Sequence, residues 1–173
     1  MGKWDHTHPG RKWELALATG FGLGLSPAAS GTMGMFWGIP LVWGLTLLEW
    51  PWQIFAALML ASLAVPICDY AEKWFGRKDD SRIVADEYLT FPIAVLGLPL
   101  REAPLMLVVA FVVTRFFDIV KPWPARQSQA LPGGYGVVID DVAAALYALA
   151  VNWAIYRFVY PLLESWIGRL WPF

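Results

Sequence analysis

Five apolar segments run through the chain, and its charged residues cluster between them and at their ends. Hydrophobic residues make up 58% of the sequence and charged residues 16%, whereas a soluble domain carries about 25% charged residues. This balance predicts an all-α integral membrane protein, a helical bundle of about five short apolar helices with polar loops on the cytoplasmic face. The apolar segments are residues 33–48, 53–68, 88–100, 103–117 and 142–163.

Most of these segments are short for a membrane span. Crossing the hydrocarbon core of a bilayer takes about 20 residues, and only residues 142–163 approach that length. The shorter segments must therefore tilt inside a bundle, thin the bilayer locally, or form hairpins that do not cross. Tryptophans near the segment ends, such as Trp50, Trp52 and Trp123, suit the interface between lipid and water.

The distribution of basic residues predicts an orientation. We expect a single membrane-embedded domain over residues 1–173, with a polar N-terminal arm at residues 1–15. If every segment crosses, the arm, residues 69–87 and residues 118–140 share one face, which carries most of the lysines and arginines. By the positive-inside rule that face is cytoplasmic. The net charge of −1 argues against a nucleic-acid partner, because proteins that bind nucleic acids present a basic surface.

The first of four polar clusters on this face is "GFGLGLSPAASGTMG", residues 20–34. Its glycine-rich backbone leaves N–H groups free to meet an anion, and Ser26, Ser30 and Thr32 add hydroxyl donors. Taken alone, the stretch is explained more simply as a membrane-helix start with Ser/Thr caps and glycines for close packing.

The second cluster is "RIVADEYLTF", in which Asp86 and Glu87 precede an apolar segment. Two interpretations stay open for this pair. Adjacent acids stabilise a helix N-terminus through the helix dipole. They also supply the oxygen ligands that a hard divalent cation prefers.

The third cluster begins at Arg115 and continues through "FFDIVKPWPARQ", directly after an apolar segment. If the helix continues to Asp118, the side chains of Arg115 and Asp118 project from one face. Pro122 disfavours helical geometry at Lys121, so the helix is predicted to end there. A snorkelling lysine beside a surface ion pair would explain part of this pattern. An acid and two bases at one helix end nevertheless exceed what anchoring requires.

The fourth cluster is "LPGGYGVVIDDVAAALYALA". Gly133, Gly134 and Gly136 permit a sharp turn with bare backbone, and Asp140 and Asp141 then open the longest apolar helix. One aspartate is explained as a helix cap, and the second is not required for capping. Two acids after a glycine-rich turn therefore indicate a cation and phosphate site.

Together the clusters place carboxylates and bases on one membrane face. The carboxylates would repel one another without a counter-ion, and Mg²⁺ commonly bridges carboxylates to phosphate oxygens. We therefore predict phosphoryl cleavage or transfer on a lipid substrate. A transporter or channel with charged residues at helix ends stays as the alternative. The carboxylates are Asp86, Glu87, Asp118, Asp140 and Asp141.

The quoted stretches, together with "TRFFDIVKPWPARQ" and "GGYGVVIDDVAAA", resemble the bacterial phosphatidylglycerophosphatase A family over roughly residues 16–155. The resemblance implies an all-helical, multi-pass enzyme of the bacterial inner membrane whose active site faces the cytoplasm. It implies removal of phosphate from phosphatidylglycerophosphate, giving phosphatidylglycerol, in the presence of Mg²⁺. The residues that depart from the usual family pattern are Ser30, Met35, Thr90 and Ala145.

Resemblance and residue chemistry together suggest roles for the site residues. The expected metal ligands are Asp86, Glu87, Asp118, Asp140 and Asp141. The expected catalytic residues are Asp118, Lys121, Arg115 and Asp141, with Arg115 and Lys121 holding the phosphate charge. The expected phosphate-binding residues are Ser26, Gly31, Thr32, Gly133, Gly134 and Gly136. Attack by water is expected, and an aspartyl-phosphate intermediate stays open as an alternative.

Overall fold

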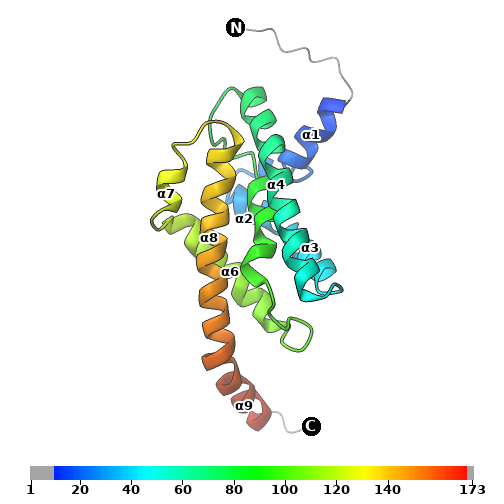
Figure 1. The fold of residues 1–173 in the computed structure, drawn as a ribbon, viewed down its shortest axis with the longest axis vertical. Helices are drawn as coiled ribbons and strands as arrows, with labels where there is room; N and C mark the ends of the chain where they lie inside the picture. Colours follow the sequence, from blue (N-terminus) through cyan, green and yellow to red (C-terminus); the bar gives the residue numbers. More distant parts are fainter. Residues whose placement is uncertain (1–9, 171–173) are drawn as a thin grey trace.

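The computed structural model describes residues 10–170, and side chains are described for residues 12–165. This part of the chain is helical and contains no strand (Figure 1). The all-α prediction is therefore confirmed. In chain order the elements are α1 (Gly10–Ala18), η1 (Leu23–Leu25), α2 (Ser30–Met35), α3 (Gly38–Leu45), α4 (Trp50–Phe75), α5 (Ala85–Thr90), η2 (Phe91–Val95), α6 (Leu105–Val120), α7 (Ala125–Ser128), α8 (Gly134–Ala154), η3 (Ile155–Val159) and α9 (Tyr160–Leu170).

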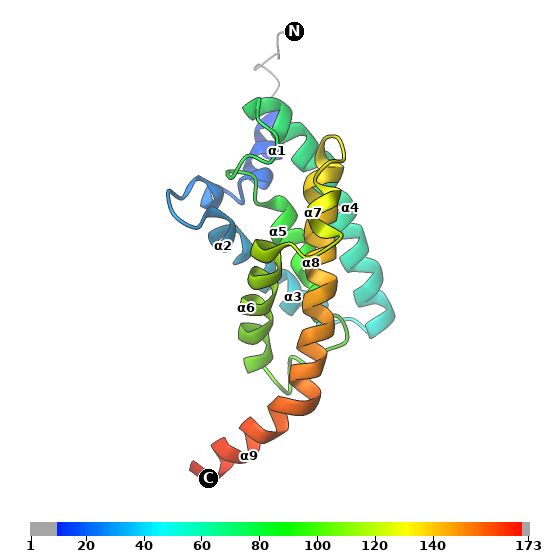
Figure 2. The ribbon, with the colours of Figure 1, turned by 90° about the vertical axis from the view of Figure 1, so that its left-hand side faces the viewer.

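Two helical runs in the described chain are long and apolar enough to cross a membrane, namely α4 and residues Gly134–Ser165. Only 28% of the most apolar stretch of α4 is buried, unlike the core helix of a soluble protein. The second run passes from α8 through the π-helical turn η3 into α9, and Figure 2 shows it along the long axis of the molecule.

The shorter predicted segments form broken helices. Residues 33–48 divide between α2 and α3, and residues 88–100 form the second half of α5, the 3₁₀ segment η2 and irregular chain. Pro92 comes two residues after the end of α5 and cannot continue its hydrogen-bond ladder. α3 has 8 residues and α5 has 6, far fewer than a bilayer core requires. A bundle of five membrane spans therefore stays a prediction.

Helix α8 lies at the centre of the bundle and contacts α4, α5, α6 and α7. Its inner face carries small buried residues, Ala144, Ala145 and Ala148, which allow close approach of neighbouring helices. At its start, a Cβ on Gly134 would lie 2.1 Å from the carbonyl oxygen of Val65 in α4. A glycine is therefore needed for α8 and α4 to meet this closely.

The outer faces of α4 and α6 are apolar and exposed. Phe55 and Leu58 on α4 are more than half exposed, as are Val108, Val112 and Phe116 on α6. A helix that faces water carries charged and polar residues on that side. These faces therefore suit lipid, in agreement with membrane association.

Candidate active site

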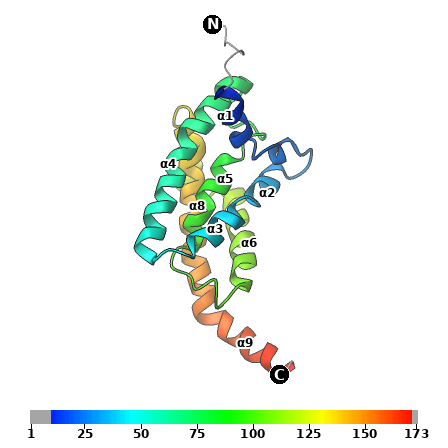
Figure 3. The same ribbon diagram turned by 90° about the vertical axis from the view of Figure 1, so that its right-hand side faces the viewer.

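The four polar clusters meet in one cleft of about 270 Å³. Figures 2 and 3 show the elements that form it side by side: the start of α2, the chain leading into α5, the end of α6 and the first half of α8. Five carboxylates and two bases line the cleft, so negative charge is in excess. These residues are Asp79, Asp86, Glu87, Asp118, Asp141, Arg115 and Lys121.

Helix α5 brings Asp86 and Glu87 to the cleft in its first turn. Glu87 accepts a hydrogen bond from Arg115 Nη1 at 2.6 Å, whereas Asp86 is buried and its Oδ1 has no partner. Burial raises the pKa of Glu87 to about 8, against the effect of the Arg115 charge. Burial and the charge of Glu87 also raise the pKa of Asp86 above its ordinary value. A cation in the cleft would lower both.

The end of α6 follows the sequence prediction. Arg115 Nη1 lies 2.6 Å from Asp118 Oδ2, which confirms that the two side chains share one face. α6 ends at Val120, and Lys121 takes a left-handed backbone with φ 47°. Lys121 Nζ lies 2.5 Å from Oδ2 of Asp140, whose side chain is only 2% exposed. Lys121 is thus paired with a buried acid, which differs from the geometry of a snorkelling anchor.

The two acids of α8 are not helix caps. α8 begins at Gly134, and its N-cap is Gly133, so Asp140 and Asp141 lie in its second turn. Both are buried, and Asp140 Oδ1 and Asp141 Oδ2 have no partner among the described residues. Asp141 lines the cleft, whereas Asp140 is not a lining residue and pairs with Lys121, which is one. The structural explanation by capping therefore fails for this pair.

Of the predicted phosphate-binding residues, Gly31 lines the cleft. A Cβ on Gly31 would lie 1.9 Å from Glu87 Oε1, so only glycine lets the α2 backbone approach this acid so closely. Ser30 lines the cleft beside it. Ser26 and Thr32 are not among the lining residues, and the Ser26 hydroxyl donates to the carbonyl oxygen of Ala28.

The three glycines at the start of α8 also lie outside the cleft lining. A Cβ on Gly133 would lie 2.3 Å from Asp69 Oδ1, and one on Gly136 would lie 2.4 Å from the carbonyl oxygen of Leu131. Together with the contact of Gly134 on α4, these distances give a packing reason for all three glycines. Their role in phosphate binding stays a prediction.

Asp79 is a cleft residue that the sequence analysis did not single out. It has a left-handed backbone with φ 51°, and its N–H donates to Oε1 of the buried Glu72 at 2.7 Å. Gln129 Nε2 bridges Asp79 Oδ2 at 3.3 Å and Asp140 Oδ2 at 2.9 Å. In the sequence, Asp79 lies in a short polar loop on the predicted cytoplasmic face. That pattern does not distinguish Asp79 from the neighbouring Asp80.

The carboxylate oxygens of the site can be compared with the oxygen ligands that Mg²⁺ prefers. Within the described residues, no three His, Cys, Asp or Glu side chains are already grouped as metal ligands. Three buried carboxylate oxygens nevertheless lack partners: Asp86 Oδ1, Asp140 Oδ1 and Asp141 Oδ2. Buried polar atoms are normally paired, and hard divalent cations prefer carboxylate oxygen. The residues therefore fit a magnesium ion in chemistry, with some rotation of side chains needed to gather them.

The family model for phosphatidylglycerophosphatase A matches residues 16–156, a range that includes every residue of the cleft. The chain belongs to the phosphatidylglycerophosphatase A family. The phosphatidylglycerophosphatase A of Escherichia coli is 32% identical over 163 residues, with 92% of this chain and 86% of the relative covered. That of Haemophilus influenzae is 39% identical over 144 residues, with 80% and 86% covered.

A Bacteroides thetaiotaomicron protein provisionally named a phosphatidylinositol-3-phosphatase is 36% identical over 154 residues, with 84% of this chain and 94% of the relative covered. The similarity thus extends to a relative with a different named headgroup. No solved structure matches the chain. Met35 and Thr90, two of the residues expected from the sequence to depart from the family pattern, line a small cavity shared with Glu87, Arg115 and Asp118. These departures lie beside the acid cluster and leave its charged residues unchanged.

Proposed function

We propose that this protein hydrolyses the phosphomonoester of phosphatidylglycerophosphate, releasing phosphatidylglycerol and inorganic phosphate, with Mg²⁺ as the cofactor. The observation that carries the proposal is the cleft itself, which places Arg115 and Lys121 among five carboxylates in a chain of this family. A phosphomonoester dianion needs fixed positive charge, and a divalent cation needs carboxylates.

The two bases are suited to hold the phosphate. A guanidinium presents five N–H donors, and Arg115 uses Nη1 for Glu87 and Asp118 while its Nε has no partner. Donors therefore remain for phosphate oxygens. Lys121 lines the same cleft and contributes a second positive charge. Both would stabilise the charge that develops on the phosphoryl group as the ester bond breaks.

The carboxylates divide between two tasks. Asp86, Asp140 and Asp141 carry the unpaired buried oxygens and would hold Mg²⁺. When bound, Mg²⁺ supplies positive charge to phosphate oxygens and lowers the pKa of water. Asp118 and Glu87 are held by Arg115 and line the cleft, so they are placed to orient a water molecule and accept its proton.

The membrane arrangement is part of the proposal. We place the protein in the bacterial inner membrane as a multi-pass protein with its cleft facing the cytoplasm. Three observations support this arrangement: the two long apolar runs, the exposed apolar faces of α4 and α6, and the excess of Lys and Arg in the segments expected on the cytoplasmic face.

The deciding experiment measures phosphate release by purified protein in mixed micelles. The substrates are phosphatidylglycerophosphate, phosphatidylinositol 3-phosphate and phosphatidic acid, each with Mg²⁺ and after exhaustive chelation. We expect the first lipid to be preferred, activity to vanish with EDTA, and Mg²⁺ to restore it. The Asp118→Asn variant, purified in parallel, excludes a contaminating phosphatase.

Each other outcome rejects a defined part of the proposal. No release from any lipid phosphate rejects the hydrolase function and favours a transporter. Preference for phosphatidylinositol 3-phosphate rejects the substrate. Full turnover after chelation rejects the metal.

A further inference from the structure

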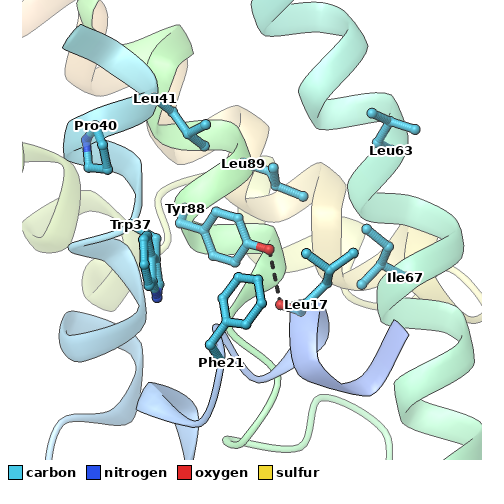
Figure 4. Close-up of a pocket in the computed structure, with 9 residues that line it drawn as sticks. All are labelled: Leu17, Phe21, Trp37, Pro40, Leu41, Leu63, Ile67, Tyr88 and Leu89. Carbon is cyan, nitrogen blue, oxygen red and sulfur yellow. Dashed lines mark hydrogen bonds between the residues drawn. The ribbon is translucent and has the colours of Figure 1, made fainter. Parts of the chain in front are cut away.

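A second cavity, of about 420 Å³, is lined almost entirely by apolar side chains (Figure 4). Its walls come from the end of α1, the start of α3, the middle of α4 and the second half of α5. The cavity is separate from the acidic cleft, because the two share no lining residue. The proposed phosphatase chemistry gives it no role.

Both polar side-chain groups in its lining already donate a hydrogen bond within the protein. The Tyr88 hydroxyl donates to the carbonyl oxygen of Leu17 at 3.0 Å, and Trp37 Nε1 donates to the carbonyl oxygen of Gly20 at 2.9 Å. The remaining lining side chains are aliphatic, proline or phenylalanine. A polar ligand would lose its own hydrogen bonds to water there without replacement. The cavity therefore selects a hydrocarbon ligand.

The cavity opens on an apolar surface. Phe21, Trp37 and Leu63 line it and are 57%, 40% and 50% exposed. In Figure 4, Phe21 and Leu63 lie at different sides of the space that Tyr88 and Leu89 border. The adjacent outer face of α4 is also apolar. A hydrocarbon chain can thus enter from a lipid environment without crossing a polar surface.

Helix α5 connects the cavity with the cleft. Asp86 and Glu87 line the cleft, and the next two residues, Tyr88 and Leu89, line the cavity. The two spaces therefore lie on different sides of one short helix, whose diameter with side chains is about 10–12 Å. A molecule with its phosphate in the cleft and a hydrocarbon chain in the cavity needs to span only the width of α5. A phospholipid, which joins a phosphate to long acyl chains, suits this arrangement.

We propose that this cavity binds one acyl chain of the phospholipid substrate whose phosphate occupies the acidic cleft. This inference rests on the proposed function, because it assigns the occupant by the covalent link between phosphate and chain. A site for one substrate chain beside the cleft would hold the headgroup in register with Arg115 and Lys121, and it would favour long-chain lipids over short-chain ones.

The test blocks the cavity without touching the cleft. Leu63→Trp adds a large ring at the lining of the cavity, and Leu58→Trp makes the same change on α4 at a residue that is 54% exposed and outside the lining. Hydrolysis of dioleoyl and dibutyroyl phosphatidylglycerophosphate is compared for both variants and the wild type. The dibutyroyl chains are too short to fill the cavity.

We expect Leu63→Trp to lower kcat/KM for the dioleoyl lipid at least about tenfold, since even one misplaced methylene in an apolar pocket carries about that factor. The rate on the dibutyroyl lipid should stay unchanged, and Leu58→Trp should alter neither. An equal loss on both lipids, or no loss on either, overturns the inference. If the wild type hydrolyses neither lipid, the proposed function has failed instead.

Photolabelling separates the substrate from bulk lipid. A phosphatidylglycerophosphate with a diazirine in the middle of one chain is irradiated with the protein, and the labelled peptides are mapped by mass spectrometry. We expect label on Leu63, Ile67 or Leu89, and we expect the same probe without its terminal phosphate to label these positions much less. Equal labelling by both probes would assign the cavity to bulk lipid and overturn the inference.

Discussion

Replacement of Lys121 by methionine separates a phosphate-binding lysine from a structural counter-ion. The Lys121–Asp140 pair joins a lysine that is 24% exposed to an acid that is 2% exposed. Lys121→Met leaves Asp140 as a buried charge with Gln129 as its remaining described partner. This variant is expected to lose both folding stability and catalytic rate, so the two losses are estimated separately.

Breaking a buried ion pair by removing one partner costs about 3–5 kcal/mol of stability. Because Lys121 is partly exposed, we expect a value near the lower end of that range. The Lys73–Asp69 pair on α4 is a matched control, since its side chains are 52% and 35% exposed and lie outside the cleft. Lys73→Met should cost at most about 1 kcal/mol. Loss of a transition-state contact at Lys121 should lower the rate about a hundredfold, or about 2.7 kcal/mol.

The assay is a double-mutant cycle with Asp140→Asn. Unfolding free energy and hydrolysis of phosphatidylglycerophosphate, normalised to folded protein, are measured for each single variant and for the pair. If Lys121 only neutralises Asp140, its removal has no effect on rate once residue 140 is uncharged. We expect stability to recover in the double variant and the rate to stay far below that of Asp140→Asn alone. Equal rates for the double variant and Asp140→Asn would refute the role of Lys121 in phosphate binding.

The remaining predictions concern three other features. Gly31→Ala places a methyl group against Glu87 and should reduce activity strongly, whereas a Cβ on Gly44 meets nothing within 4 Å, so Gly44→Ala should leave activity unchanged. Similar activities for the two variants would show that the close approach of Gly31 to Glu87 is dispensable. Asp79→Asn should lower kcat by about 10-fold to 100-fold with little change in melting temperature, as for other residues that orient a metal site, and wild-type kcat would exclude it from the site. A thiol probe in residues 77–82 should react from the cytoplasm and one after Arg169 from the periplasm; reaction from one side would show that the number of crossings is even.

The sequence predicted which charged residues come together better than it predicted the lengths of the helices. Arg115 and Asp118 were paired by the three-residue spacing of a helix, and Pro122 located the end of that helix at Lys121. These are local rules, which hold whatever surrounds the helix. The partner of Lys121 could not be predicted, because Asp140 lies 19 residues away and meets it only through the packing of α8 against α6.

Helix lengths were harder to predict because apolar composition does not separate a long helix from a broken one. Residues 33–48 and 88–100 are as apolar as the rest, but their Gly and Pro residues interrupt the hydrogen-bond ladder. The start of α8 at Gly134 was placed too late by the apolar pattern, which begins only at residue 142. The error made Asp140 and Asp141 look like helix caps, although both are buried within the helix.

The pairing of charges in the cleft explains why a cation and a phosphate would bind together. Arg115 pairs with Glu87 and Asp118, and Lys121 pairs with Asp140, so a phosphate that draws on the charge of these bases weakens their hold on the acids. Carboxylates released in this way would be left uncompensated in a largely buried site, at a cost of several kcal/mol for each charge. The proposed Mg²⁺ would offset that cost by placing positive charge beside the same acids. By thermodynamic linkage each ligand would then raise the affinity for the other, so we expect the phosphomonoester and the proposed Mg²⁺ to bind with positive cooperativity.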